Sequence, residues 1–209
     1  MKPDYILFTD ASVRLDRTDH SNVSAYAAVV LNVKSKQYTV ISGPLENRSI
    51  SFCEAWAIYQ GLRYLCKIHR ENKLKHSKIL VVTDSKLNVQ ILTDWIQNVW
   101  DTSDWYHWKK NSPGEIKNQD LYRKIVPLLN DERFKVKIVH INSHSEKNKT
   151  KQAKIFAKLV NADVKLDKET MKLFVKFNAL ADETAHGLVT DQIRNTGFIQ
   201  LKRKKDLLI

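Results

Sequence analysis

The 209-residue chain has few of the residues that cross-link or interrupt small proteins: two cysteines, four prolines and five glycines. Cys53 and Cys66 fall in one predicted helix at a spacing that does not bring them together, so we expect two reduced thiols. No apolar run approaches the ~18 residues of a membrane span, and the first residues lack the apolar stretch of a signal peptide. These absences predict a soluble, intracellular protein whose hydrophobic core is stable without disulfides or structural metal ions.

Acidic residues are scarce beside basic ones: 23 Asp and Glu against 35 Lys and Arg, a formal net charge of +12. A surplus of this size favours a polyanionic partner, and nucleic acid is the commonest polyanion. A lysine-rich proteome would produce the same surplus without such a partner, so charge alone leaves both explanations open.

Short apolar segments rich in β-branched and aromatic residues alternate with segments of helical spacing, which indicates a mixed α/β fold. We expect Gly43-Pro44 to break the chain after the third of five strands, which are Tyr5–Thr9, Ser24–Leu31, Gln37–Ile41, Lys78–Thr83 and Phe134–Ile141. The expected helices run from Phe52, capped by Ser51, to about Ile68, from Ser85 to about Val99, and over Asn118–Leu129. The remainder reads as helical, with a break near Asn161–Asp167 and an end close to Gly187.

Four carboxylates stand in distinct settings along this frame. Asp10 and Asp84 each follow a strand-like run, whereas Glu54 and Asp182 lie in helix-like stretches. Gathered together, they would form an all-oxygen site for hard divalent cations, and Mg²⁺ held by few protein oxygens usually works on phosphates. Two such ions about 4 Å apart can clamp the attacking and leaving oxygens of a phosphodiester. A helix cap, a turn or a solvated helix position would explain each of these residues alone. Such roles explain all four together poorly.

The order and setting of these motifs resemble ribonuclease H of type 1. The resemblance runs from Tyr5 to about Leu188 and rests on Thr9-Asp10-Ala11-Ser12, Glu54-Ala55-x-Ala57, Thr83-Asp84-Ser85 and Asn178-x-x-x-Asp182-Glu183-x-Ala185. It implies a ribonuclease H-like fold, in which a five-stranded mixed sheet has three antiparallel strands, then parallel ones, and flanking helices. The catalytic domain would cover residues 1–190, with a basic handle at about 95–122, a helical insertion at about 146–177, and a basic tail at 191–209.

The resemblance also implies an endonuclease that cuts the RNA strand of RNA–DNA hybrids. Asp10, Glu54, Asp84 and Asp182 would be catalytic and would hold two Mg²⁺ ions, which Mn²⁺ can replace, with Asp10 bridging both. The products would carry 5′-phosphate and 3′-hydroxyl ends. His144, in the loop after the fifth strand, would be a catalytic proton shuttle, and a surface-loop histidine is its alternative.

Other positions match the family's nucleic-acid contacts. In the handle, cations would bind phosphates and rings would pack on sugars and bases, although a packed Trp cluster with a solvated charged rim is an alternative. Ser49 and Asn118 match positions that line a pocket for a DNA phosphate. The full set of expected nucleic-acid contacts is Ser12, Ser49, Ser51, Lys86, Trp100, Lys109, Lys110, Lys117, Asn118 and Asn178.

The largest departure from the family pattern is the lysine-rich segment Glu146–Phe177. Its apolar residues recur at near-helical spacing, at Ile155, Leu159, Met171, Phe174 and Phe177. We expect a helical pair, or an extension of the last helix, that either packs on the core or contacts substrate. The residues at positions that contact the minor groove in the family also differ. Ile50 and Ser51 stand where the family often has asparagines, and Lys86 stands where it often has glutamine.

Two other classes stay open. A DNA-directed nuclease of the same superfamily, such as a resolvase or exonuclease, would share the carboxylates, but the handle and the helix-borne Glu54 disfavour it. A non-catalytic nucleic-acid-binding module would not require a negative cluster facing phosphates. We expect a monomer with an RNA–DNA hybrid as partner and no membrane association. Whether the enzyme is free-standing or processed from a reverse transcriptase polyprotein stays undecided.

Overall fold

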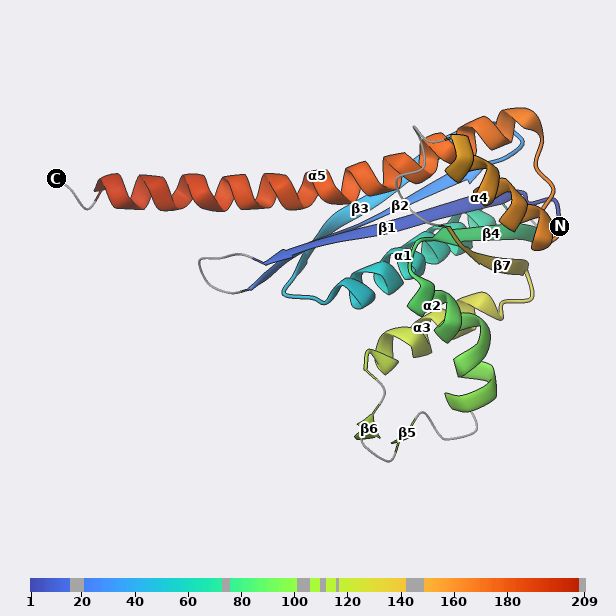
Figure 1. The fold of residues 1–209 in the computed structure, drawn as a ribbon, viewed down its shortest axis with the longest axis horizontal. Coiled ribbons are helices and arrows are strands. Elements are labelled where there is room, and N and C mark those ends of the chain that lie inside the picture. Colours follow the sequence, from blue (N-terminus) through green and yellow to red (C-terminus); the bar gives the residue numbers. More distant parts are fainter. Residues whose placement is uncertain are drawn as a thin grey trace.

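The computed structural model describes residues 1–15, 21–72, 76–100, 106–109, 112–115, 117–141 and 149–206. Its centre is a five-stranded sheet in the order β3-β2-β1-β4-β7 (Figure 1). The pairs β1–β2 and β2–β3 are antiparallel, whereas β1–β4 and β4–β7 are parallel. The strands are β1 (Tyr5–Leu15), β2 (Asn22–Asn32), β3 (Tyr38–Glu46), β4 (Ser77–Thr83) and β7 (Phe134–His140). The mixed sheet expected from the sequence is confirmed.

Helices cover both faces of this sheet, and a small two-stranded sheet, β5–β6, lies apart from it (Figure 1). The elements are α1 (Ile50–Glu71), α2 (Lys86–Gln90), the π-helical η1 (Ile91–Trp100), β5 (Tyr106–Lys109), β6 (Ser112–Glu115), α3 (Gln119–Leu129), α4 (Lys149–Asn161) and α5 (Lys168–Asp206). Among the described helices, none combines the length and the apolar character needed to cross a membrane.

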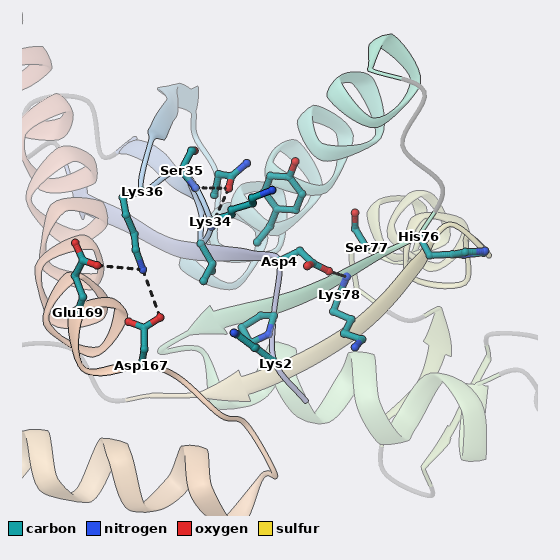
Figure 2. A pocket seen from close by; sticks show the side chains of 14 residues that line it. Lys2, Asp4, Lys34, Ser35, Lys36, His76, Ser77, Lys78, Asp167 and Glu169 are labelled. Atoms are coloured by element: carbon teal, nitrogen blue, oxygen red, sulfur yellow. Dashed lines mark hydrogen bonds and ion pairs between the residues drawn. The ribbon is translucent and has the colours of Figure 1, made fainter.

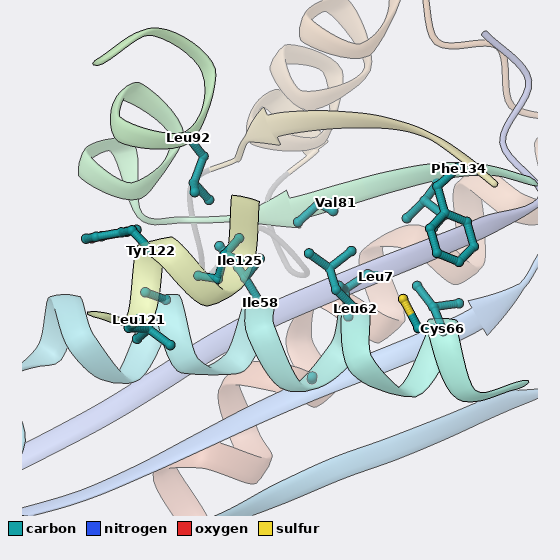
Figure 3. Close-up of a cluster of buried hydrophobic side chains, with 14 of the residues drawn as sticks. Leu7, Ile58, Leu62, Cys66, Val81, Leu92, Leu121, Tyr122, Ile125 and Phe134 are labelled. Carbon is teal, nitrogen blue, oxygen red and sulfur yellow. The ribbon is translucent and has the colours of Figure 1, made fainter. Parts of the chain in front are cut away.

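Side chains of β1 contribute to two hydrophobic clusters, one on each face of the sheet, because successive side chains of a strand point to opposite faces. Leu7 joins a cluster with Leu62 of α1 and Ile125 of α3, shown in Figure 3. Phe8 joins the cluster on the other face, where its ring meets that of Phe174 of α5 edge-on at a centroid distance of 5.0 Å. The central strand β4 is buried from both sides, as its nearly continuous apolar run predicted.

The insertion packs on the second of these clusters. Ile155 and Leu159 of α4 and Phe174 and Phe177 of α5 are all buried there. A break separates α4 from α5, so the expected helical pair is confirmed. Packing on the core is thus confirmed for these four apolar positions of the insertion, while substrate contact by its lysines stays a prediction.

Four local predictions are wrong. β1 continues past Thr9 to Leu15, because it stays paired with β2 throughout. β3 continues through Gly43-Pro44, because it is an edge strand, where a proline can direct its missing N–H toward solvent. The N-cap of α1 is Ser49, whose side chain accepts a hydrogen bond from the Phe52 N–H, rather than Ser51. α5 runs through Gly187 to Asp206, since one helical glycine costs only about 1 kcal/mol.

The helix expected from Ser85 to Val99 also differs in form. Ser85 is the N-cap, as expected, and accepts a hydrogen bond from the Asn88 N–H. The α-helical part ends at Gln90, and the chain continues as the wider π-helical η1. This element leads into the handle region.

Candidate active site

Four elements bring the predicted carboxylates to one region of the sheet. Asp10 lies within β1, and Asp84 directly follows β4. Because the parallel pairing of these strands ends with Thr9 opposite Thr83, Asp10 and Asp84 follow at the same level on neighbouring strands. Glu54 comes from the first turns of α1 on one face, and Asp182 comes from α5 on the other.

These carboxylates lie close enough to alter one another's ionisation. Burial raises the pKa of Asp10 to about 8, and the charges of Asp84, Asp182 and Glu54 act in the same direction. A 2.7 Å hydrogen bond from the Ala11 N–H opposes this rise. Burial likewise raises the pKa of Glu54 to about 7, aided by the charge of Asp84 and opposed by hydrogen bonds from Ser85 and Asn88.

The chemistry of this donor set fits a hard divalent cation, because all of its donors are carboxylate oxygens. A cation among them would relieve the repulsion that raises the pKa of Asp10 and Glu54. In the described part of the chain, no group of three or more His, Cys, Asp and Glu side chains is arranged so that it could hold a metal ion as it stands.

A buried polar network supports Glu54. Asn88 of α2 is fully buried, and its Nδ2 lies 3.3 Å from Oε2 of Glu54 and 2.9 Å from Oγ of Ser85. The hydroxyl of Tyr122 in α3 donates a 2.7 Å hydrogen bond to Oδ1 of Asn88. Sequence reasoning missed both residues, and the one available signal was the position of Asn88 four residues after Asp84.

Several predicted nucleic-acid contacts lie beside the carboxylates along the chain. Ser12 lies two residues after Asp10, on the same face of β1. Asn178, only 8% exposed, lies one turn before Asp182 in α5. Lys86, the first residue of α2, is exposed.

The residues predicted to line a phosphate pocket occupy two helix N-termini. Ser49 caps α1, and its Oγ lies 3.3 Å from Oγ of Ser51. Asn118 precedes α3 in a left-handed conformation, with a φ of 62°, and its side chain makes no capping hydrogen bond. Lys117 is exposed next to it. Helix N-termini suit anions, so both positions agree with the expected role, which stays a prediction.

The remaining predicted site residues have no described side chain. His144 and Lys110 lie outside the described residues. Trp100 in η1 and Lys109 in β5 are described in backbone only. Their expected roles stay predictions.

A pocket of about 1070 Å³ lies at the opposite end of the strands from the carboxylates, around the starts of β1 and β4 (Figure 2). Several of its polar groups contact one another. Lys36 Nζ lies 3.5 Å from Asp167 and 3.7 Å from Glu169, and Asp4 accepts a 2.8 Å hydrogen bond from the Lys78 N–H. We therefore assign the functional site to the carboxylates rather than to this pocket.

The comparison with protein families agrees with this site. The RNase H family model matches residues 2–162, most of the chain, and this segment contains Asp10, Glu54 and Asp84. The chain belongs to the RNase H family. It is a ribonuclease H enzyme. Asp182 lies beyond the matched segment, so its assignment rests on its proximity to Asp10.

Solved structures share the fold at low sequence identity. The foamy viral protease-reverse transcriptase in complex with an RNA/DNA hybrid is 16% identical, with a TM-score of 0.60, over 90% of this chain and 20% of that chain. The same viral protein in complex with dsDNA is 18% identical, with a TM-score of 0.56, over 69% of this chain and 85% of that chain. LC9-RNase H1, a type 1 RNase H with the type 2 active-site motif, is 15% identical, with a TM-score of 0.52, over 76% of this chain and 73% of that chain. No curated protein matches the chain.

Proposed function

We propose that this ribonuclease H is a metal-dependent endonuclease that hydrolyses the RNA strand of RNA–DNA hybrids. The observation that carries the proposal is the mutual influence of four carboxylates from four elements, in a chain with a net charge of +12. A negative cluster repels phosphates, so it would weaken a module that only binds nucleic acid. A cation-dependent phosphodiesterase, in contrast, requires it. The hybrid-bound foamy viral protein, which shares the fold, supports hybrid as the substrate.

Asp10, Glu54, Asp84 and Asp182 would hold the cofactor, two Mg²⁺ or Mn²⁺ ions. Bound there, the ions supply activation of the attacking water and stabilisation of the leaving 3′-oxygen, which yields 5′-phosphate and 3′-hydroxyl ends. The raised pKa of Asp10 and Glu54 favours their protonated forms in the free protein, so cation binding would release protons.

The other residues orient the site and the substrate. Asn88 holds Glu54 in place through its amide. Ser49 and Asn118 would bind a phosphate of the DNA strand, and Ser12 and Asn178 would contact the hybrid. Contacts with successive 2′-hydroxyls would distinguish the RNA strand from DNA. The handle would grip the DNA strand through Trp100, Lys109 and Lys110, and His144 would move protons. We further propose that the enzyme acts as an intracellular monomer.

The test is an incubation of the full chain with labelled RNA–DNA hybrid, dsRNA, ssRNA and dsDNA, each with Mg²⁺ or EDTA. We expect cleavage only of the RNA strand of the hybrid, and only with Mg²⁺. Cleavage of dsDNA while hybrid is spared would replace the proposal with a DNA-directed nuclease. Tight hybrid binding with no cleavage would favour a binding module instead.

A further inference from the structure

The insertion helix α4 reaches the active-site region through Lys158. The Nζ of Lys158 lies 3.4 Å from Nδ1 of His140, the last residue of β7. His140 pairs with Thr83 across the β4–β7 ladder, one residue before Asp84, and its ring hydrogen-bonds the backbone of Asp84. One histidine therefore connects the insertion to an active-site aspartate.

A second cation stands in the same place. Burial and the positive charges of Lys158 and Lys86 lower the pKa of His140, against the opposing effects of the Asp84 backbone and carboxylate. Lys158 contacts the His140 ring, and Lys86 begins α2 two residues after Asp84. Both lysines are exposed. The two ammonium groups therefore lie on the solvent side of the region that carries Asp84.

Neither ammonium group is neutralised by a carboxylate among the described residues, where no ion pair involves Lys86 or Lys158. The partner of Lys158 is an imidazole nitrogen of His140, 3.4 Å away, and not a carboxylate. An ammonium group has three donors, so this contact leaves Lys158 its charge and two further N–H groups. Lys36 differs, because Asp167 and Glu169 flank it.

A phosphate is the ligand that two such exposed ammonium groups suit. We propose that Lys158 and Lys86 bind a phosphate of the RNA strand next to the scissile one, and that His140 positions Lys158 for this contact. The inference rests on the proposed function, because the carboxylates fix where the scissile phosphate lies. The insertion packs on the core, and through Lys158 it would also contact the substrate.

The test compares Lys158→Gln with Lys135→Gln, a matched control that changes an exposed lysine near the start of β7, at the other end of that strand from His140. Hybrid affinity is measured at several salt concentrations, with Ca²⁺ replacing Mg²⁺ so that the RNA stays intact. One lost phosphate contact makes the slope of log affinity against log salt shallower by about 0.9. We expect this change, with a loss of affinity of roughly 3- to 10-fold at low salt, in Lys158→Gln only. Equal slopes in the two variants would overturn the inference.

A second measurement identifies the phosphate itself. Hybrids that carry one neutral methylphosphonate at successive positions of the RNA strand should include a position that weakens binding of the wild type and leaves Lys158→Gln unaffected. His140→Ala should make the salt slope partly shallower, an effect that a purely structural histidine would not produce. Equal losses for wild type and Lys158→Gln at every position would also overturn the inference. Wild-type protein that neither binds nor cuts hybrid would overturn the proposed function with it, whereas normal cleavage with unchanged variants would overturn the Lys158 contact alone.

Discussion

The hydroxyl of Tyr122 donates a 2.7 Å hydrogen bond to Oδ1 of Asn88 and thereby fixes which end of that buried amide faces the active site. Because Oδ1 accepts from Tyr122, the donor end, Nδ2, is directed to Glu54. The two residues are 34 positions apart, and their bond joins α3 to α2 behind a predicted metal ligand. Groups that orient ligands in this way commonly change metal affinity or activity by about 10- to 100-fold when they are replaced.

We therefore expect Tyr122→Phe to lower kcat by about 10-fold, with little change in the Michaelis constant for hybrid. It should also lower the free energy of unfolding by about 1–3 kcal/mol, because a buried acceptor loses its partner. The matched control is Tyr64→Phe, since the Tyr64 hydroxyl lies 3.0 Å from Oγ1 of Thr39, in contact with β3 rather than with the carboxylates. Steady-state kinetics and urea unfolding of both variants measure these effects. Equal kcat values in the two variants would show that the network is only structural.

Asp10 makes the metal-free protein less stable as the pH rises. Its pKa in the folded protein is about 8, against an ordinary value of 3.8, so the folded state binds more protons between these values. Stability is unaffected by this group below about pH 4, falls as the pH rises through this interval, and carries the full penalty above about pH 8. In EDTA, Asp10→Asn should therefore be more stable than wild type at pH 8, by about 5 kcal/mol, and about equally stable near pH 4. Thermal unfolding at both pH values tests this, and a constant difference between them would contradict it.

Two glycines in helices should respond oppositely to alanine. At Gly61 in α1, an added Cβ would lie 2.3 Å from Cδ1 of Leu7, so this helix packs on β1 only because the position lacks a side chain. Gly61→Ala should lower the free energy of unfolding by about 1–3 kcal/mol. In the double variant, Leu7→Ala should relieve part of the clash. At Gly187 in α5, nothing lies within 4 Å of an added Cβ, so Gly187→Ala should stabilise by about 0.5–1 kcal/mol. Chemical denaturation of the single and double variants measures both, and the same sign at both positions would refute the account.

His144, which lies outside the described residues, gives a kinetic prediction. Replacing a general acid–base group typically costs about 10²–10⁴-fold, and solvent can partly take over from a loop histidine. We expect His144→Ala to slow turnover by about one to three orders of magnitude without abolishing it. His76→Ala serves as the control, because His76 lines the pocket at the far end of the strands. A pH–rate profile identical to that of wild type would assign His144 to the surface loop alone.

The sheet could be predicted from the sequence because its signals are local. Alternation and apolar runs identify strands, and the order of elements then limits the topology. The predicted carboxylates also lie at strand ends or on helices, where short motifs are readable. The N-cap of α1 was harder, because Ser49 and Ser51 both offer a hydroxyl and only the backbone geometry separates them.

The contacts that complete the site could not be predicted in this way. Asn88 and Tyr122 meet across 34 positions, and Lys158 and His140 meet across 18. No local pattern encodes these contacts, because they depend on how α2 meets α3 and how α4 packs on the sheet. The continuation of α5 past Gly187 was missed for a different reason: a local stop signal carried too little free energy to end the helix.

The central claim is that the four carboxylates form a cation-dependent site for the scissile phosphate. The most direct measurement is single-turnover cleavage of a labelled RNA–DNA hybrid across a Mg²⁺ titration, for wild type, Asp10→Asn and the control Asp191→Asn, which changes an exposed aspartate of α5. The account predicts Mg²⁺-dependent cleavage by wild type and Asp191→Asn, and none by Asp10→Asn at any Mg²⁺ concentration, although that variant folds. Cleavage by Asp10→Asn at close to the wild-type rate would contradict the account.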